Sequence, residues 1–311
     1  MKCLVTGCAG FIGSNLTDQL LKDGHDVIGV DCFTDYYPES IKRQNLVNAL
    51  SYARFILIQS DLIEMDSYPD VDVVFHLAAQ AGVRASWGSD FLVYSKNNIE
   101  VTQKLLEFYK EKELKKFVYA SSSSVYGDVT LPMNENMRLQ PVSPYGVTKL
   151  AAEHLCSLYS KNFGVPTVSL RYFTVYGPRQ RPDMAINKFV CAILNNQEIT
   201  LYGDGTQTRD FTYVSDIIEA NRMAAKSGSP GSIINIGGGS RITVNDLIDV
   251  LEQNCGMTAK IQFSGTQKGD VQDTLADNSR ARRDLGWVPT VPIREGAKKY
   301  VQWYFKNVNV R

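Results

Sequence analysis

Near the start of the chain stands Gly7-Cys8-Ala9-Gly10-Phe11-Ile12-Gly13, a Gly-x-x-Gly-x-x-Gly pattern. An apolar run over residues 3–5 precedes it, and a segment of helical period over residues 12–23 follows it. Glycines let the backbone turn tightly and approach a pyrophosphate, whose charge is favoured at the positive end of a helix. The pattern therefore predicts a dinucleotide-binding turn between a strand and a helix.

Asp31 ends a second apolar run, over residues 27–30, near the spacing expected for a carboxylate that binds the adenosine ribose. It can accept hydrogen bonds from both ribose hydroxyls, whereas a 2′-phosphate in the same place would meet like charge. We therefore predict NAD as the cofactor rather than NADP. Asp61 and Leu62 follow the third run and are expected beside the adenine, although an ordinary strand-end turn explains them equally well.

Short apolar runs without polar alternation recur through the first two-thirds of the chain, each followed by a segment of helical period. The runs cover residues 3–5, 27–30, 55–58, 71–75, 116–119 and 167–170. The helical segments cover residues 12–23, 39–50, 95–112 and 145–163. Runs of this kind are typical of parallel strands buried on both faces. The predicted fold is α/β, a Rossmann-type doubly wound parallel sheet.

The rhythm changes after residue 177, where glycine-rich turns separate shorter elements. Those turns are Gly177-Pro178, Gly203-Asp204-Gly205 and Gly237-Gly238-Gly239. We predict an NAD-binding domain over residues 1–177 and a smaller, mixed α/β substrate-binding lobe over residues 178–311. The apolar residues 232–236 are expected to form a strand that returns to the main sheet.

The composition excludes several classes of protein. Lys plus Arg and Asp plus Glu both total 33, so no positive field attracts nucleic acid. No apolar run approaches the ~18 residues of a membrane span, and the first residues already form a predicted strand, so we expect a cytoplasmic protein. Six scattered cysteines without a CxxC pair and three histidines predict neither a disulfide nor a metal site.

The predicted catalytic pair is Tyr145 and Lys149, which a four-residue spacing places on one face of a helix. The lysine cation, together with the positive nicotinamide ring, would stabilise a tyrosine phenolate and lower the tyrosine pKa, so that Tyr145 could act as a general base. The spacing alone is common on exposed helices. The serines of residues 121–124, however, end a predicted strand and place a hydroxyl over the same cleft.

With these motifs the sequence resembles the extended short-chain dehydrogenase/reductase family, specifically its nucleotide-sugar epimerases. The resemblance covers nearly the whole chain. It is carried by residues 7–13, Asp31, His76-Leu77-Ala78-Ala79, Asn97-Asn98, residues 121–127, 145–149 and 171–178, Arg209-Asp210-Phe211 and Gly269-Asp270. It implies a catalytic trio of Ser122, Tyr145 and Lys149.

The resemblance also implies two sets of binding residues. The cofactor would be bordered by Gly7, Gly10, Phe11, Ile12, Gly13, Asp31, Asp61, Leu62, Leu77, Ala78, Ala79, Asn97, Tyr145, Lys149 and Phe173. A UDP-sugar substrate would meet Arg209 at its diphosphate, Asp270 at its ribose and Tyr202 at its base. Without the resemblance, Arg209 or Asp270 could equally be half of a surface ion pair.

The reaction implied is a reversible oxidation at the sugar C4. Relatives that dehydrate or decarboxylate carry an acidic residue where this chain has Ser123 or Ser124, so no extra acid is available to protonate a leaving group. In the hypothesised mechanism, Tyr145 takes the 4-hydroxyl proton while hydride passes to NAD. Ser122 is hydrogen-bonded to the same oxygen, and the hydride later returns to the other face of the ketone.

The sugar is indicated by Thr174, where galactose-type 4-epimerases usually carry asparagine, and by residues 181–185 and Gly82-Val83-Arg84. These resemble UDP-glucuronate 4-epimerases. Ser123, Ser124, Thr174 and Arg181 could then hold the 6-carboxylate, although Arg181 could instead cap a loop or meet the diphosphate. The alternatives are a UDP-glucose or UDP-N-acetylglucosamine 4-epimerase and, from another class, a non-catalytic NAD-binding sensor.

A homodimer is implied by the resemblance alone. The helical segments 95–112 and 145–163 carry apolar side chains that in the family build a dimer interface, namely Val101, Leu105, Leu106, Leu150, Leu155 and Leu158. Packing against the sheet explains at least half of that apolar surface.

Overall fold

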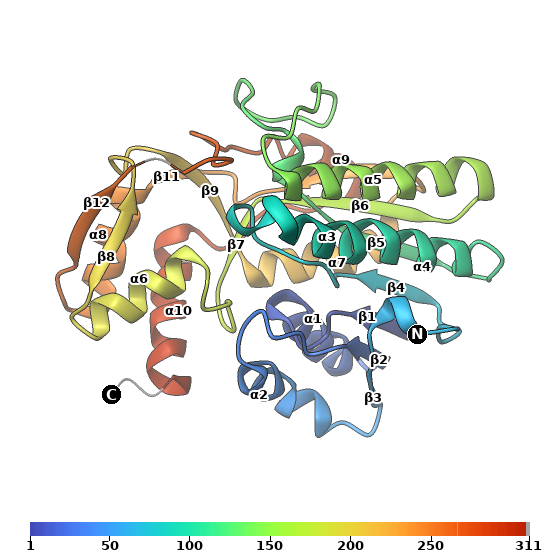
Figure 1. Ribbon diagram of the computed structural model, residues 1–311. Coiled ribbons are helices and arrows are strands. Elements are labelled where there is room, and N and C mark those ends of the chain that lie inside the picture. The colour runs from blue at the N-terminus through green and yellow to red at the C-terminus, as the bar shows by residue number, and fades with distance from the viewer. Residues whose placement is uncertain (266, 309–311) are drawn as a thin grey trace.

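A seven-stranded parallel sheet forms the centre of the computed structural model, which describes residues 1–265 and 267–308 (Figure 1). The strands are β1 (Lys2–Thr6), β2 (Asp26–Asp31), β3 (Phe55–Gln59), β4 (Val73–His76), β5 (Lys116–Ser122), β6 (Thr167–Tyr172) and β10 (Ser232–Ile236). Their order is β10-β6-β5-β4-β1-β2-β3, which reverses direction beside β1. The doubly wound sheet is therefore confirmed, and β10 returns to it by pairing with β6.

Helices cover both faces of this sheet. One face packs against α1 (Phe11–Lys22), α2 (Glu39–Leu50), α7 (Val214–Ser227) and α9 (Ser279–Leu285), and the other against α4 (Val101–Tyr109) and α5 (Pro144–Phe163). Within β1, the side chains of Cys3 and Val5 pack on the face covered by α1, α2, α7 and α9, whereas Leu4 packs on the face covered by α4 and α5. Because both faces are buried, the strands show no polar alternation, which is the pattern seen in the sequence.

The predicted helix over residues 95–112 begins earlier than expected, ends at Tyr109, and is divided into three consecutive elements over residues 91–109. These are the short α3 (Phe91–Tyr94), a π-helical turn η4 (Ser95–Glu100) and α4. In the π-helical turn, Asn98 is buried and bonds the backbone of Gln80 through both its amide oxygen and its amide nitrogen. π-Helical turns are frequent at functional sites because they redirect neighbouring side chains, and here Asn97 lines a pocket.

A smaller lobe lies beside the large sheet, at the left of Figure 1. Its sheets contain β7 (Thr174–Tyr176), β9 (Thr208–Tyr213) and β11 (Arg241–Thr243) in the order β11-β9-β7, and β8 (Glu198–Tyr202) paired with β12 (Lys260–Ser264). Three helices complete it, α6 (Ala185–Leu194), α8 (Val244–Cys255) and α10 (Ile293–Asn307). This lobe has a hydrophobic core of its own.

The chain passes between the lobes several times. The strand β7 follows β6 directly but pairs with β9 of the smaller lobe, and α7, β10 and α9 return to the large sheet. The predicted boundary at residue 177 stays a prediction. Residues on each side of it contribute to both lobes.

Three properties of the described residues complete the fold. All six cysteines are free thiols. Within residues 1–265 and 267–308, no three His, Cys, Asp or Glu side chains are grouped in a way that could hold a metal ion. None of the helices in the same ranges is long and apolar enough to cross a membrane.

Candidate active site

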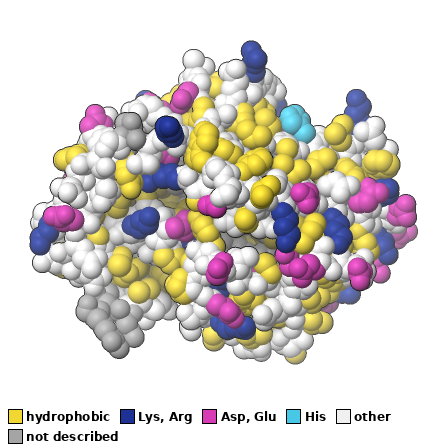
Figure 2. All heavy atoms as spheres, in the orientation of Figure 1, with side chains coloured by type: hydrophobic (Ala, Val, Ile, Leu, Met, Phe, Trp, Pro, Cys, Tyr) yellow, Lys and Arg dark blue, Asp and Glu magenta, His cyan; other side chains and the backbone are white. Residues whose placement is uncertain are grey.

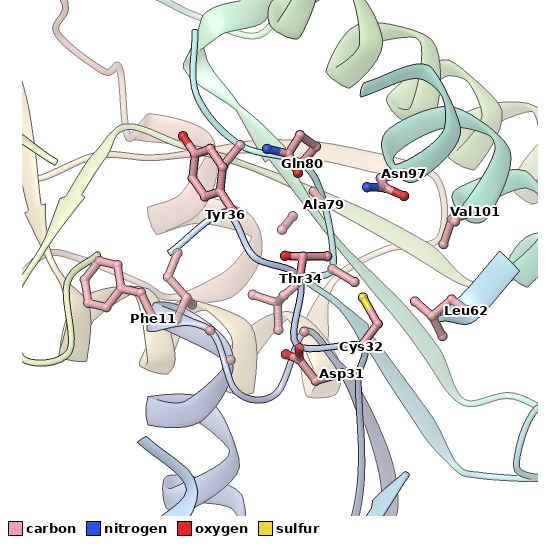
Figure 3. A pocket seen from close by; sticks show the side chains of 18 of the residues that line it. Phe11, Asp31, Cys32, Thr34, Tyr36, Leu62, Ala79, Gln80, Asn97 and Val101 are labelled. Carbon is pink, nitrogen blue, oxygen red and sulfur yellow. The ribbon is translucent and has the colours of Figure 1, made fainter. Parts of the chain in front are cut away.

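A pocket opens at the carboxyl ends of the central strands, where ligands bind in sheets of this kind (Figure 3). Most of the predicted cofactor residues line it. They are Gly7, Gly10, Phe11, Ile12, Gly13, Asp31, Asp61, Leu62, Leu77, Ala78, Ala79, Asn97, Tyr145 and Lys149. Of the predicted substrate residues, Arg181 lines it as well. Segments far apart in the sequence thus meet around one cavity.

The glycine turn fits a diphosphate. A side chain at Gly13 would place its Cβ 2.1 Å from the Gly7 carbonyl oxygen, so the turn closes this tightly only with glycine. Helix α1 begins directly after the turn, and its N-cap residue Gly10 has no side chain to occupy the first N–H groups. Those N–H groups and the positive end of the helix remain available for an anion.

Asp31 is held in one orientation beside this turn. Its carboxylate accepts hydrogen bonds from the backbone N–H groups of Ala9 (3.0 Å) and Phe33 (2.9 Å). Asp61 lies on the same pocket and pairs with Lys96 at 2.9 Å. A carboxylate fixed in this way, beside a turn that admits a diphosphate, suits the ribose of a dinucleotide.

A buried histidine fixes the opposite wall of the pocket. Thr6 Oγ1 accepts the N–H groups of Leu77 and Ala78, both at 3.1 Å, so its own proton is directed to His76 Nδ1 at 2.8 Å. His76 Nε2 then donates to Thr102 Oγ1 at 2.9 Å. Burial lowers the pKa of His76 to about 3, so the ring is neutral and the chain of hydrogen bonds keeps one direction.

Two of the predicted catalytic residues, Tyr145 and Lys149, line the pocket, and Ser122 is within hydrogen-bond reach of Tyr145. Helix α5 begins at Pro144 with Ser143 as its N-cap, whose hydroxyl accepts the Gly146 N–H at 3.1 Å, and this places Tyr145 in the first turn. Burial raises the pKa of Tyr145, while a hydrogen bond from Ser122 and the charge of Arg181 lower it. Ser122 Oγ accepts the Ser124 N–H at 3.1 Å, so its proton is free for Tyr145.

Lys149 lies one helical turn beyond Tyr145 and is almost completely buried. Its ammonium nitrogen is 4.8 Å from the centre of the Tyr119 ring. Burial lowers the pKa of Lys149 to about 8, and the charge of Glu153 opposes this effect. In the protein without its cofactor, burial holds the pKa of Tyr145 above its ordinary value, and Ser122 and Arg181 oppose this effect. The reduction expected from Lys149 together with the nicotinamide ring stays a prediction.

Arg181 reaches the pocket from the loop after β7. Its guanidinium forms two bonds with the Asp183 carboxylate, at 2.9 and 3.0 Å, and lies 5.8 Å from the ring of Tyr36. The Tyr36 hydroxyl donates to the same carboxylate at 3.3 Å. Tyr36 and Gln80 both line the pocket and are labelled in Figure 3.

Sequence reasoning missed several pocket residues. Tyr36 and Gln80 line the pocket, and Tyr94 packs edge-on against Tyr145 with ring centres 6.2 Å apart. No motif marks these positions, because Tyr36 and Gln80 are brought to the site by loops and Tyr94 by the short helix α3. Phe173, predicted beside the cofactor, is buried against Tyr126 instead, and its neighbour Tyr172 lines the pocket.

Four of the predicted substrate residues form a second group, outside this pocket. Arg84 bonds Asp270 at 2.6 Å and lies 4.3 Å over the ring of Tyr202. Arg209 donates to the backbone carbonyl of Gln272 at 3.0 Å. Burial lowers the pKa of Arg209, and the negative charge of Asp270 opposes this effect. Arg84 belongs to the large lobe and the other three to the small lobe, so the group bridges the two.

The remaining predicted substrate residues lie next to strand ends. Ser123 and Ser124 form the 3₁₀ turn η5 (Ser123–Val125) directly after Ser122, and Thr174 is the first residue of β7. Val101, Leu105 and Leu106, named with a dimer interface, are buried in the core between α4 and the sheet. Packing against the sheet therefore explains these three, whereas Leu158 is exposed.

The chain matches a known family model over residues 3–237, described as the NAD dependent epimerase/dehydratase family. It is 46% identical over 303 residues to a Bacillus subtilis protein described as "Uncharacterized UDP-glucose epimerase YtcB", with 95% of each chain covered. It is 40% identical over 315 residues to the UDP-glucuronate 4-epimerase of Thermodesulfobacterium geofontis, covering 99% of this chain and 97% of the relative.

A solved structure has the same fold along its whole length. The crystal structure of UDP-glucuronic acid 4-epimerase from Bacillus cereus, in complex with UDP-glucuronic acid and NAD, matches with a TM-score of 0.96 and 45% identity. The match covers 98% of this chain and 99% of that one.

Proposed function

This chain belongs to the NAD dependent epimerase/dehydratase family, and we propose that it is a UDP-glucuronate 4-epimerase that interconverts UDP-glucuronate and UDP-galacturonate. The observation that carries the proposal is the meeting of Ser122, Tyr145 and Lys149 at a dinucleotide pocket, with serines at positions 123 and 124. Such a site can oxidise and re-reduce a carbon, and those two positions offer no acid to expel a leaving group.

NAD is the cofactor, and it supplies reversible hydride transfer when bound. The glycine turn and the N-terminus of α1 hold its diphosphate, and Asp31 holds the adenosine ribose. Tyr145 takes the proton of the sugar 4-hydroxyl and later returns it. Ser122 donates a hydrogen bond to the same oxygen, and Lys149 keeps a positive charge beside the phenolate.

The glucuronate carboxylate requires its own donors. Serine and threonine hydroxyls of Ser123, Ser124 and Thr174 are placed around the end of β5 and the start of β7, and Arg181 lies near Tyr145. A 4-keto uronate is a β-keto acid, which loses CO₂ when its carboxylate bond aligns with the ketone π system. Several fixed hydrogen bonds keep the carboxylate out of that alignment.

A second candidate is a UDP-glucose 4-epimerase, which the description of the Bacillus subtilis relative favours. The two functions differ in one assay. The purified protein is incubated with NAD and either UDP-glucuronate or UDP-glucose, and the products are separated by chromatography. We expect UDP-galacturonate from the first and little conversion of the second, with no net change in NADH. Preferred conversion of UDP-glucose would overturn the glucuronate assignment.

We also propose that the enzyme is a cytoplasmic homodimer. Large apolar side chains are exposed on α3 and α5, namely Leu92, Val93, Val147 and Leu158, and Figure 2 shows hydrophobic side chains gathered over this region. An exposed apolar patch of this kind is typical of a protein interface. Six free cysteines fit a reducing compartment. Sedimentation should give twice the mass of the chain, and Val147→Glu with Leu158→Glu should halve it.

A further inference from the structure

Asp210 is a completely buried carboxylate that no step of the proposed reaction uses. It lies on β9, next to Arg209. Of the pattern Arg209-Asp210-Phe211, the sequence analysis assigned a role only to the arginine. Burial raises the pKa of Asp210 to about 6, against the effect of backbone hydrogen bonds from Ala276, Gly238 and Gly239. Burying a carboxylate destabilises the folded protein unless the carboxylate is hydrogen-bonded. The groups that bond Asp210 therefore indicate its role.

Both carboxylate oxygens of Asp210 are bonded to backbone. Oδ1 accepts the Gly238 N–H at 2.6 Å, and Oδ2 accepts the Ala276 N–H at 2.9 Å. The backbone approaches this closely because position 238 is glycine, where a Cβ would lie 2.1 Å from the Phe211 carbonyl oxygen. Asp210 therefore joins β9 to two other segments of the chain.

The first of these segments links the two lobes. Gly238 lies two residues after β10 of the large sheet, and three residues later the chain enters β11, which pairs with β9. The bond to Gly238 thus fixes the smaller lobe at the point where the chain leaves the large sheet.

The second segment carries the other proposed substrate residue, Asp270. Beyond Ala276, the Asp210 N–H donates to Thr274 Oγ1 at 3.0 Å, and the Thr208 N–H donates to the Asp273 carboxylate at 3.2 Å. Arg209 itself donates to the Gln272 carbonyl at 3.0 Å. Residues 208–210 are therefore bonded to residues 272–276, directly after Asp270.

We propose that Asp210 is a positioning residue for the UDP half of the substrate, because its carboxylate fixes Arg209 and Asp270 relative to each other and to the large sheet. This inference rests on the proposed function, in which Arg209 and Asp270 contact UDP. This role requires a carboxylate at position 210, because both of its oxygens accept backbone N–H groups. An asparagine side chain has one acceptor oxygen, and its NH₂ group would face the second backbone N–H.

The test compares Asp210→Asn with a matched control, Asp216→Asn. Asp216 is equally buried and accepts the backbone N–H groups of Thr290 and Val291, both at 3.1 Å, but it lies on α7 and bonds no segment of the UDP group. Binding of UDP and of NAD is measured by calorimetry, about two pH units above the Asp210 pKa, together with kcat, KM and the melting temperature.

We expect Asp210→Asn to weaken UDP binding and raise the KM for UDP-glucuronate by roughly tenfold, with kcat and NAD affinity within about twofold of wild type. Asp216→Asn should lose similar thermal stability yet bind UDP normally. Wild-type UDP affinity in Asp210→Asn, or an equal loss of affinity in Asp216→Asn, would overturn the inference.

Two further measurements keep the test decisive. If Asp210→Asn does not fold, Thr274→Val removes the acceptor of the Asp210 N–H, and we expect a smaller loss of UDP affinity, about threefold. Normal UDP affinity in that variant contradicts the inference.

If Arg209→Gln and Asp270→Asn both keep normal UDP affinity, the proposed substrate site fails and the inference with it. If they weaken UDP binding and Asp210→Asn does not, the inference alone fails.

Discussion

The two ends of the proposed active site are built in different ways. The cofactor end consists of backbone turns and apolar walls, and its polar side chains Asp31, Thr6 and His76 are each bonded to neighbouring groups in one geometry. The UDP end consists of half-exposed charges, Arg84 and Asp270, that bond each other across two lobes. The side chains of the cofactor end are thus already fixed in the protein without ligand, whereas the charges of the UDP end pair with each other.

This difference has a physical reason. A dinucleotide that stays bound through many turnovers is best held by a rigid, preformed surface, because little ordering remains to be done on binding. A substrate that must enter and leave is held by charges whose pairing in the free protein offsets part of the attraction. Substitutions at one end should therefore leave binding at the other end unchanged.

The largest effect is expected from Tyr145→Phe, which lies between the two ends. Loss of the general base should reduce kcat by about 10³-fold or more. Affinity for NAD and for UDP should change by less than about twofold, since phenylalanine keeps the ring that lines the pocket and removes only the hydroxyl. Substantial residual epimerisation, or loss of either ligand, would contradict the assignment.

Arg209→Gln should affect the UDP end alone. Loss of a charged donor to the diphosphate should weaken UDP binding by roughly 30-fold, about 2 kcal/mol, as measured by calorimetry. Arg294→Gln, at an exposed arginine of α10, serves as the control and should bind UDP normally. A parallel loss of NAD affinity in Arg209→Gln would show that the two ends are not independent.

Asp31→Asn should affect the cofactor end alone. It keeps one acceptor and removes the charge, so NAD affinity should fall by about tenfold while UDP affinity stays constant. The same change should reduce discrimination against NADP, because the like charge that repels a 2′-phosphate is gone. Unchanged preference for NAD would remove Asp31 from this role.

Thr174→Ala tests the carboxylate site between the two ends. Loss of one neutral hydroxyl donor should raise the KM for UDP-glucuronate by about fivefold and increase the decarboxylated UDP-pentose by-product. Turnover of UDP-glucose should be unaffected. If neither the KM nor the by-product changes, Thr174 does not hold the carboxylate.

His76 gives a pH signature of the preformed cofactor end. Its pKa is about 3 in the folded protein and about 6.5 when unfolded, so between these values only the unfolded state binds the proton. The free energy of unfolding should fall as pH drops below 6.5, by up to about 1.4 kcal/mol per pH unit from this residue. His76→Gln should remove that slope, and His154→Gln, at an exposed histidine, should retain it.

The accuracy of the sequence predictions follows the same division. Residues 7–13 and Asp31 could be placed because the turn, the helix and the next strand are adjacent in the chain, and their roles depend on backbone geometry that few residues allow. The strands were predicted for a similar reason, since burial on both faces leaves a continuous apolar run. The helix over residues 95–112 was predicted as continuous, and no local pattern indicated its π-helical turn.

The sequence by itself determined the doubly wound sheet, the dinucleotide turn and the Tyr145–Lys149 spacing, because each leaves a pattern within a few residues of the chain: a buried apolar run, a glycine motif or a helical spacing. Only the tertiary structure decided that Arg181 acts on Tyr145 together with the predicted Ser122, and which residues join Arg209 to the segment after Asp270. Those contacts connect residues 23 to more than 60 positions apart. Their geometry is set by the packing of two lobes, which no spacing in the sequence records.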